Sequence, residues 1–399
     1  MSLSCSRKTI QTHRTIALSH KTNKLKPIKT TYHAIGLMSG SSLDGLDIAY
    51  CQLETAWEDV AFFVKNWELL LADTLPFSEA WQARLRQLPS ATALDFCSVH
   101  AAFGHYLGEL VNQFLAKNRL SAVNVDLIAS HGHTIFHEPA RGFTVQIGDG
   151  AALAAPTGCR VVCDFRTSDV ALGGQGAPLA PMADKILFPG YDFYLNIGGI
   201  ANITCDVGHG SRFVAFDVCG ANQALNALAN LVGQSFDVDG KIAASGQLDP
   251  VLFEKINAQD FFQKPFPKSL SNQWVQQHLT AECLQATSPV ADRLHTVCRH
   301  IANQLEQSVR QVLENEHLEK GKYRLLATGG GAFNRYLMQC IQQQLPEVEV
   351  IVPSENVVKF KEALLMALLG VMRLEGAPNC IASVTGASRD AIGGGVFLP

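Results

Sequence analysis

The sequence lacks any run of the roughly 18 apolar residues that a membrane-spanning helix needs, and it lacks an excess of basic charge. Its 32 Lys and Arg are outnumbered by 36 Asp and Glu, so the formal net charge is −4. A chain without a basic field does not hold nucleic acid or an anionic membrane through its overall charge. These absences argue against a membrane or nucleic-acid partner and favour a small molecule.

Paired cysteine motifs are missing as well. The 11 cysteines stand singly, and none forms a C-x-x-C pair. An odd number of scattered cysteines argues against a disulfide framework and against a zinc site. We therefore expect reduced thiols in a cytoplasmic protein.

Acidic residues are absent from positions 1–31, which carry seven Lys or Arg. Such a one-signed segment with isolated apolar residues is typical of an unstructured extension. Transit peptides share the same bias, so a targeting role stays open. We expect the folded part to begin at Tyr32.

The rest of the chain has the length and apolar content for two domains, because 47% of its residues are hydrophobic and 17% are charged. Apolar residues at helical spacing predict helices over 93–117 and 290–315. They also predict a shorter helix over 361–374, which is a candidate for returning to the first half of the fold. A hairpin and a third strand precede the first helix, and the same order recurs after a Gly-rich break at 173–178. The sequence thus predicts two copies of one α/β topology.

The predicted division follows this repeat. Domain I comprises 32–170 together with about 371–399, and domain II comprises 171–370.

Three glycine-rich turns follow apolar strands, at 39–42, 198–199 and 329–331. Glycine lets a backbone approach a ligand closely, and consecutive N–H groups form an anion-binding nest. Each turn alone is also compatible with a purely structural role. None matches the Walker sequence or the G-x-G-x-x-G fingerprint, but three equivalent turns in two repeated halves favour a nucleotide clasped between two domains. That is the architecture of the actin, Hsp70 and sugar-kinase superfamily.

The chain carries a longer set of motifs in order from residue 33 to residue 399: GLMSGSSLDGLD, SHGHTIFHEP, TVQIGDGAALA, DFRTSDVALGGQGAPLAP, LNIGGIANIT, DGKIAASG and TGGGAFNRYLM. This set resembles the successive signatures of the anhydro-N-acetylmuramic acid kinases. The chain departs from the family pattern at Ser41 (usually Thr), at His133 (usually Gln) and in FDVCGAN, residues 216–222, where the family has FD-x-G-P-G-N.

The resemblance implies two similar ribonuclease H-like domains of the actin-like ATPase type, with a cleft between them for nucleotide and sugar. It implies an enzyme that uses ATP and Mg²⁺ to open the 1,6-anhydro ring of 1,6-anhydro-N-acetylmuramic acid with water while phosphorylating O6. The product would be N-acetylmuramate 6-phosphate, in the recycling of cell-wall peptidoglycan. The implied partners are the sugar and ATP, and a homodimer is left open.

Two carboxylates are the predicted catalytic residues. Attack of water on an anomeric carbon needs a carboxylate base, and Asp217 follows a predicted strand and matches the base aspartate of the family. Its alternative role is capping the next helix. Glu362 matches a cleft glutamate that orients sugar and water, and its alternative is a solvated glutamate near the start of a helix.

The remaining predicted site residues are grouped by ligand. Those assigned to ATP are Gly40, Ser41, Ser42, Leu43, Asp44, Gly45, Leu46, Asp47, Gly198, Gly199, Asn202, Gly329, Gly330, Gly331 and Asn334. Those assigned to the sugar are His131, His137, Gln175 and Asn222. Asp44 is also the candidate for holding Mg²⁺, because this cation takes few protein ligands and keeps several waters.

Two other functions remain open from the sequence. One is a kinase of the same superfamily that acts on a different amino sugar. The other is a non-enzymatic, nucleotide-switched binding protein, which would need no acid in the cleft; Asp217 argues against it.

Overall fold

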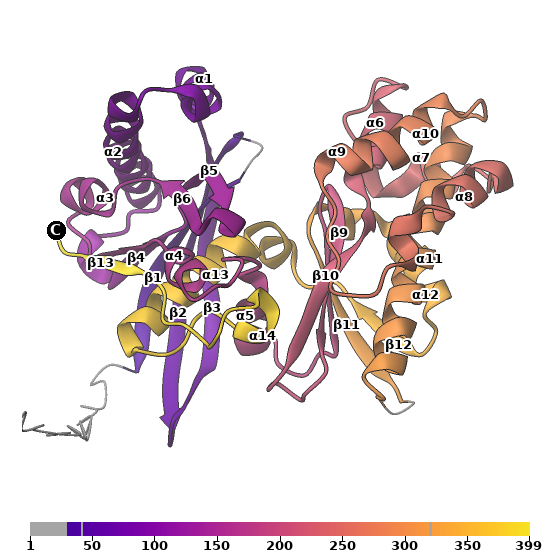
Figure 1. Ribbon diagram of the computed structural model, residues 1–399. Coiled ribbons are helices and arrows are strands. Elements are labelled where there is room, and N and C mark those ends of the chain that lie inside the picture. The colour runs from indigo at the N-terminus through magenta and orange to yellow at the C-terminus, as the bar shows by residue number, and fades with distance from the viewer. Residues whose placement is uncertain (1–29, 41–42, 319–320) are drawn as a thin grey trace, which may run out of the picture.

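The computed structural model describes residues 30–40, 43–318 and 321–399. Nearly all of the basic N-terminal extension lies outside the described residues, as do Ser41 and Ser42 of the first glycine turn. The first strand begins at Thr31, next to the predicted start of the fold. Figure 1 shows two lobes side by side, each built on its own sheet.

The first lobe contains a six-stranded sheet with the order β13-β7-β4-β1-β2-β3. Strands β1, β2 and β3 are antiparallel neighbours, and β4 and β7 follow in parallel on the other side of β1. The strands are β1 (Thr31–Ser39), β2 (Gly45–Glu58), β3 (Ala61–Pro76), β4 (Leu127–Ser130), β7 (Val161–Cys163) and β13 (Gly395–Phe397). A small separate hairpin consists of β5 (His133–Glu138) and β6 (Phe143–Ile147).

The second lobe repeats this plan in a five-stranded sheet with the order β10-β9-β8-β11-β12. Again three antiparallel strands come first and two parallel strands follow. The strands are β8 (Phe193–Ile197), β9 (Ile200–Asp206), β10 (Phe213–Gly220), β11 (Tyr323–Thr328) and β12 (Val348–Ile351). The duplicated topology confirms the predicted fold class of two similar α/β domains.

The helices of the first lobe cover both faces of its sheet (Figure 1). They are α1 (Glu79–Gln87), α2 (Ala93–Lys117), α3 (Gly150–Thr157), α4 (Thr167–Ala171), α5 (Ala180–Leu187), α13 (Glu355–Glu375) and α14 (Ala382–Thr385). Helix α2 begins after Thr92, whose hydroxyl accepts from the Asp95 N–H at 3.2 Å and so caps the helix. Its bounds are those predicted, because a cap and a regular apolar stripe mark both ends in the sequence.

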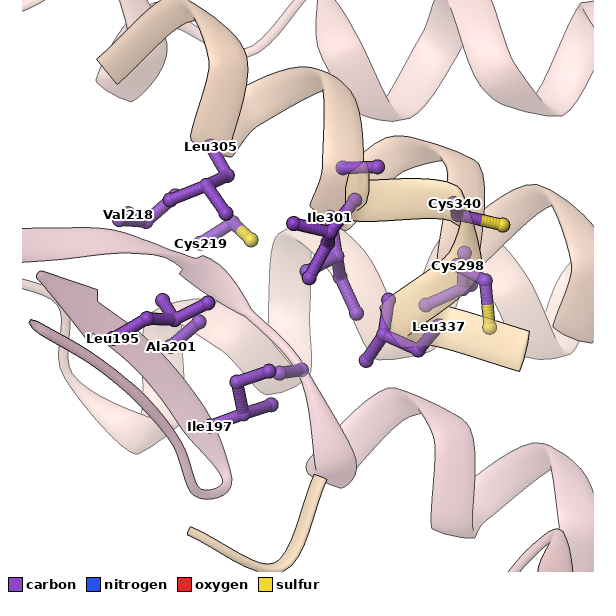
Figure 2. Close-up of a cluster of buried hydrophobic side chains, with 14 of the residues drawn as sticks. Leu195, Ile197, Ala201, Val218, Cys219, Cys298, Ile301, Leu305, Leu337 and Cys340 are labelled. Atoms are coloured by element: carbon purple, nitrogen blue, oxygen red, sulfur yellow. The ribbon is translucent and has the colours of Figure 1, made fainter. Parts of the chain in front are cut away.

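The helices of the second lobe share a buried core with its sheet. They are α6 (Asn222–Asn230), α7 (Lys241–Ala244), α8 (Pro250–Asn257), α9 (Asn272–Val275), α10 (Ala281–Gln285), α11 (Val290–Asn315) and α12 (Arg335–Gln344). Figure 2 shows the core that joins them to the sheet: Leu195 and Ile197 face Ile301 and Leu305 of α11. Burial of such side chains contributes about 1.5–3 kcal/mol each, which fixes the strand ends that carry the glycine turns.

Helix α13 packs on the first sheet, against β1, β2 and β4, although it lies late in the chain. The contact is so close that a Cβ on Gly36 would lie 1.8 Å from the Ala363 carbonyl oxygen. Helix α5 packs against α13 and β3 in the same lobe. This arrangement differs from the predicted division, which assigned 171–370 to domain II: α5 and most of α13 pack on the first sheet, because the apolar residues of α13 are buried against it, while Val358 joins the core of the second lobe.

Within the described ranges, every helix is too short or too polar to cross a membrane.

Candidate functional site

A cavity of about 650 Å³ opens between the two lobes. The first lobe contributes Arg166, Gln175 and Glu362, and the second contributes Asn202 and Asp217. Four of these five were predicted site residues, from segments far apart in the sequence. The cavity is therefore the place where the two halves of the predicted site meet.

Asp217 lies in β10, beside a bulge between positions 217 and 219. Its Oδ2 accepts from the backbone N–H of Leu270 at 2.7 Å, and its own N–H donates to the carbonyl of Lys268 at 3.0 Å. Burial raises the pKa of the carboxyl, and the bond from Leu270 opposes that shift. Asp217 does not cap α6, whose N-cap position is Ala221. The strand thus holds the carboxylate at the cavity wall with one oxygen committed to the backbone.

Glu362 projects from α13 into the cavity, where its side chain is exposed. It forms no hydrogen bond or ion pair within the described part of the chain. Enclosure by the surrounding walls raises its pKa, and the carboxylate of Asp47 adds to the rise, while Arg166 and Lys361 oppose it. The neighbouring Lys361 points away, into a buried ion pair of 2.5 Å with Asp184 of α5.

The first predicted phosphate loop is described only in part. Leu43 and Leu46 are buried in the core, so their side chains are not available to a ligand. Gly45 pairs with Pro76, and a Cβ there would lie 2.6 Å from the Leu75 carbonyl oxygen, so this glycine is required for strand pairing. The predicted ATP role of these three residues can be met only by their backbone.

The other two glycine turns lie together at the end of the second sheet. A Cβ on Gly331 would collide with Ile197, which precedes Gly198, and a Cβ on Gly329 would lie 2.6 Å from the Asn196 side-chain oxygen. The Gly199 carbonyl accepts from the Ala221 N–H at 2.8 Å, which ties the turn to the residue that precedes α6.

Asn196 also lines the cavity and is the cavity residue nearest in sequence to the turn at 198–199. Gly330 is exposed, and the nearest atom to a Cβ there is the Asn222 Nδ2 at 3.8 Å.

Two predicted asparagines are held by local backbone partners. Asn222, assigned to the sugar, donates from Nδ2 to the Ile197 carbonyl at 3.1 Å and so lies at the glycine turns. Asn334, assigned to ATP, is buried and caps α12 by accepting from the Leu337 N–H at 2.9 Å. In both cases a local backbone partner satisfies the side chain, which sequence spacing alone did not reveal.

The histidines of the SHGHTIFH segment do not share one ligand site. His131 is 5% exposed and lies behind Arg166, which donates from Nε to the His131 Nε2 at 2.9 Å. Burial lowers the pKa of His131 to about 3, and Arg166 contributes to the shift, so the ring is neutral. His133 pairs with the Ser39 hydroxyl, and His137 is exposed with its Nδ1 3.1 Å from the Thr144 hydroxyl.

Three cavity residues were missed as ligand candidates: Arg166, Asn196 and Lys268. Arg166 lies in the DFRTSD motif between two aspartates, Asp164 and Asp169, but it bonds to His131 and to the Gly176 carbonyl. Asn196 lies two residues before the second glycine turn, and this position was the available signal. Lys268 follows a Pro-rich segment with no motif that marks it.

The carboxylates near the first loop suit a hard cation. Asp44 is exposed, and Asp47 accepts from the Thr74 hydroxyl at 2.5 Å. Burial raises the pKa of Asp47, Thr74 opposes the rise, and the negative charge of Asp44 adds to it. Among the described residues, no three His, Cys, Asp or Glu side chains gather as a metal-binding group. Magnesium held with a nucleotide commonly uses one or two carboxylates plus phosphate oxygens, so the pair fits that chemistry.

Comparison with known proteins adds an independent result. The family model described as anhydro-N-acetylmuramic acid kinase matches residues 32–399. A protein of that name from Methylorubrum populi is 35% identical over 93% of this chain and 100% of its own length. One of the same name from Shewanella sediminis is 33% identical over 92% of this chain and 99% of its own length.

Among solved structures, component A of the Acidaminococcus fermentans (R)-2-hydroxyglutaryl-CoA dehydratase matches with a TM-score of 0.43 and 13% identity, over 84% of this chain and 96% of that one. The family match spans the whole of both lobes and includes every segment that lines the cavity. The chain therefore belongs to the anhydro-N-acetylmuramic acid kinase family.

Proposed function

We propose that this protein is a kinase that opens 1,6-anhydro-N-acetylmuramic acid with water and phosphorylates O6 at the expense of ATP, yielding N-acetylmuramate 6-phosphate and ADP for peptidoglycan recycling. Family membership supports the reaction class. The observation that carries the proposal is the meeting of Asp217 and Glu362, from different lobes, in one cavity whose wall also includes Asn196, two residues before a glycine turn.

In the proposed reaction, Asp217 is the general base. It takes a proton from water as the water oxygen bonds to the anomeric carbon, and the bond from that carbon to the bridging oxygen breaks. The released O6 bonds to the γ-phosphorus of ATP, and ADP leaves. The raised pKa of Asp217 suits this role, because a base with a higher pKa is a stronger proton acceptor.

Glu362 orients the sugar and the water beside Asp217. Its carboxylate is free to accept from hydroxyl groups, because no described residue already donates to it. Its placement on a long helix packed against the first sheet supports a fixed geometry.

The glycine turns supply backbone N–H groups to phosphate oxygens. Gly330 is exposed, with no neighbouring atom closer than 3.8 Å to a Cβ position, whereas the Gly198 N–H already donates to the Ile200 carbonyl at 3.2 Å. Asp44 and Asp47 are the proposed holders of Mg²⁺, which when bound neutralises charge on the phosphates. Small, accessible turns and a pair of carboxylates are together sufficient for phosphoryl transfer, which depends mainly on positioning and electrostatics.

The proposed location is the cytoplasm. Within the described ranges the ten cysteines are free thiols, nine of them buried, as is usual in a reducing compartment.

Incubation of the protein with Mg-ATP and a panel of sugars tests the proposal. We expect ADP and a phosphorylated, ring-opened product with 1,6-anhydro-N-acetylmuramic acid. Turnover only with a sugar that has a free 6-hydroxyl would instead establish the kinase of another amino sugar. Sugar-independent hydrolysis of ATP would establish a nucleotide switch.

A further inference from the structure

Arg166 places a cation at the cavity wall that the described protein does not neutralise. Its Nε donates to His131 and its Nη1 donates to the Gly176 carbonyl at 2.6 Å. No ion pair to it exists among the residues that the structure describes, although Glu362 is near enough to raise its pKa against the lowering effect of burial. The Nη2 group has no partner within the same residues, and Arg166 lines the cavity.

The guanidinium group is held from two sides. His131 donates from Nδ1 to the Gly132 carbonyl, with 3.0 Å between the atoms, which leaves Nε2 as the acceptor for Arg166. Gly176 is fixed in turn, because its N–H donates to the Oδ2 of the fully buried Asp169 at 2.7 Å. A side chain ordered in this way before binding loses little further entropy when a ligand arrives.

Lys268, the other cation that lines the cavity, already contacts groups of its own lobe. Its Nζ donates to the Phe262 carbonyl at 3.4 Å and lies 5.0 Å from the centre of the Phe261 ring. Arginine also presents a planar fork that matches a carboxylate better than an ammonium group does.

We propose that Arg166 binds the carboxylate of the acidic sugar substrate, and that His131 is a positioning residue that acts through Arg166. The inference rests on the proposed function, since a muramic acid is a sugar that carries a carboxylate. Arg166 would then select acidic sugars over neutral ones of the same shape.

Kinetics with a matched pair of substrates tests this assignment. The pair is 1,6-anhydro-N-acetylmuramic acid and its uncharged carboxamide, with ADP release as the readout. A charge-assisted pair predicts that the wild type prefers the acid by about ten- to a hundred-fold in kcat/KM. In Arg166→Gln the preference should fall close to one, mainly through KM for the acid, with the amide little affected. Arg166→Lys should retain part of it.

Two further variants separate positioning from general damage. His131→Leu should weaken the preference for the acid while kcat for the amide is retained, and Lys268→Gln should preserve the preference. Equal losses for acid and amide in Arg166→Gln would assign Arg166 to the transferred phosphate and overturn the inference, as would loss of the preference in Lys268→Gln alone. If the wild type does not turn over the acid at all, the proposed function itself is wrong.

Discussion

At the scale of single residues, the two cavity carboxylates have separable roles. Asp217→Asn removes the base but keeps a side-chain oxygen that can accept from the Leu270 N–H, so we expect a folded protein. Product formation should fall by roughly 10² to 10⁴, the range for general-base assistance, with ATP affinity little changed. Steady-state kinetics and ATP titration measure both quantities.

The matched control is Asp192→Asn, another aspartate that accepts from a backbone N–H, that of Arg324 at 2.8 Å, away from the cavity. It should retain wild-type turnover. If Asp217→Asn kept more than about a tenth of the wild-type rate, or if Glu362→Gln were the less active variant, Asp217 would not be the base.

Glu362 should also affect how stability depends on pH. Enclosure by the cavity walls and the charge of Asp47 raise its pKa in the folded protein above the ordinary 4.5. A carboxyl of this kind contributes stability that is fully present below its unfolded pKa and is lost as the pH rises through the folded pKa. Glu362→Gln, which cannot ionise, should therefore melt at a higher temperature than the wild type at about pH 7.5, and this difference should vanish below about pH 4.

Thermal unfolding across this pH range, followed by circular dichroism, makes the comparison. Glu355→Gln alters an exposed glutamate of the same helix and should show no pH-dependent gain. A gain of equal size at both pH values would show that the effect does not come from ionisation of Glu362.

At the scale of elements, the contact between α13 and β1 is too close for any side chain at Gly36. Gly36→Ala would place a Cβ against the Ala363 carbonyl, so α13 must move away from the sheet. Overpacking of this kind costs about 1–3 kcal/mol of the free energy of unfolding. Denaturant unfolding should show that loss, and kcat should fall with it because α13 carries Glu362. Unchanged stability and activity would mean that the helix is not held in this position.

Gly330, in the third glycine turn, differs from Gly36 because no neighbouring atom crowds it. Gly330 has an open environment and no positive φ, so Gly330→Ala should leave stability unchanged. If its backbone approaches a phosphate, however, the added methyl group should raise KM for ATP several-fold while KM for the sugar stays constant. Equal KM values for ATP in Gly330→Ala and the wild type would show that the turn is only structural.

Local signals explain which elements the sequence predicts well. Helix α11 has the predicted bounds because its apolar stripe is regular along its length. The pattern of α13 indicates a helix with buried residues on nearly all sides, but no local rule states which sheet will cover them. The same limit applies to the site. Asp217 is visible in a motif, although β10 continues past it to Gly220, whereas the pairing of Arg166 with His131 joins residues 35 positions apart.

At the scale of the whole molecule, the two lobes differ in how their cores are assembled. Apart from Val358, the main buried core of the second lobe, between its sheet and its helices, comes from one continuous stretch, Phe193 to Val348. Tyr194, Phe213 and Leu326 of the same sheet are buried in a cluster shared with α13. The core of the first lobe needs residues of α13 against Ala34 and Ala129. A fragment of residues 190–353 should therefore fold alone and unfold cooperatively, and a fragment of residues 30–189 should not.

Circular dichroism melts and amide proton spectra of the two fragments compare them directly. Addition of residues 354–399 to the second fragment, as a separate peptide, should restore folding of the first lobe. Cooperative unfolding of fragment 30–189 without that peptide would contradict this dependence.

The late position of α13 also matters while the chain is being synthesised. Strands β1 and β2 leave the ribosome first, yet the helix that covers them is among the last segments to be translated. The second lobe can complete its core during translation, while the first sheet keeps an apolar face open to solvent. Nascent chains that stall before residue 355 therefore carry a folded second lobe joined to an uncovered sheet, which is a species that chaperones and proteases recognise.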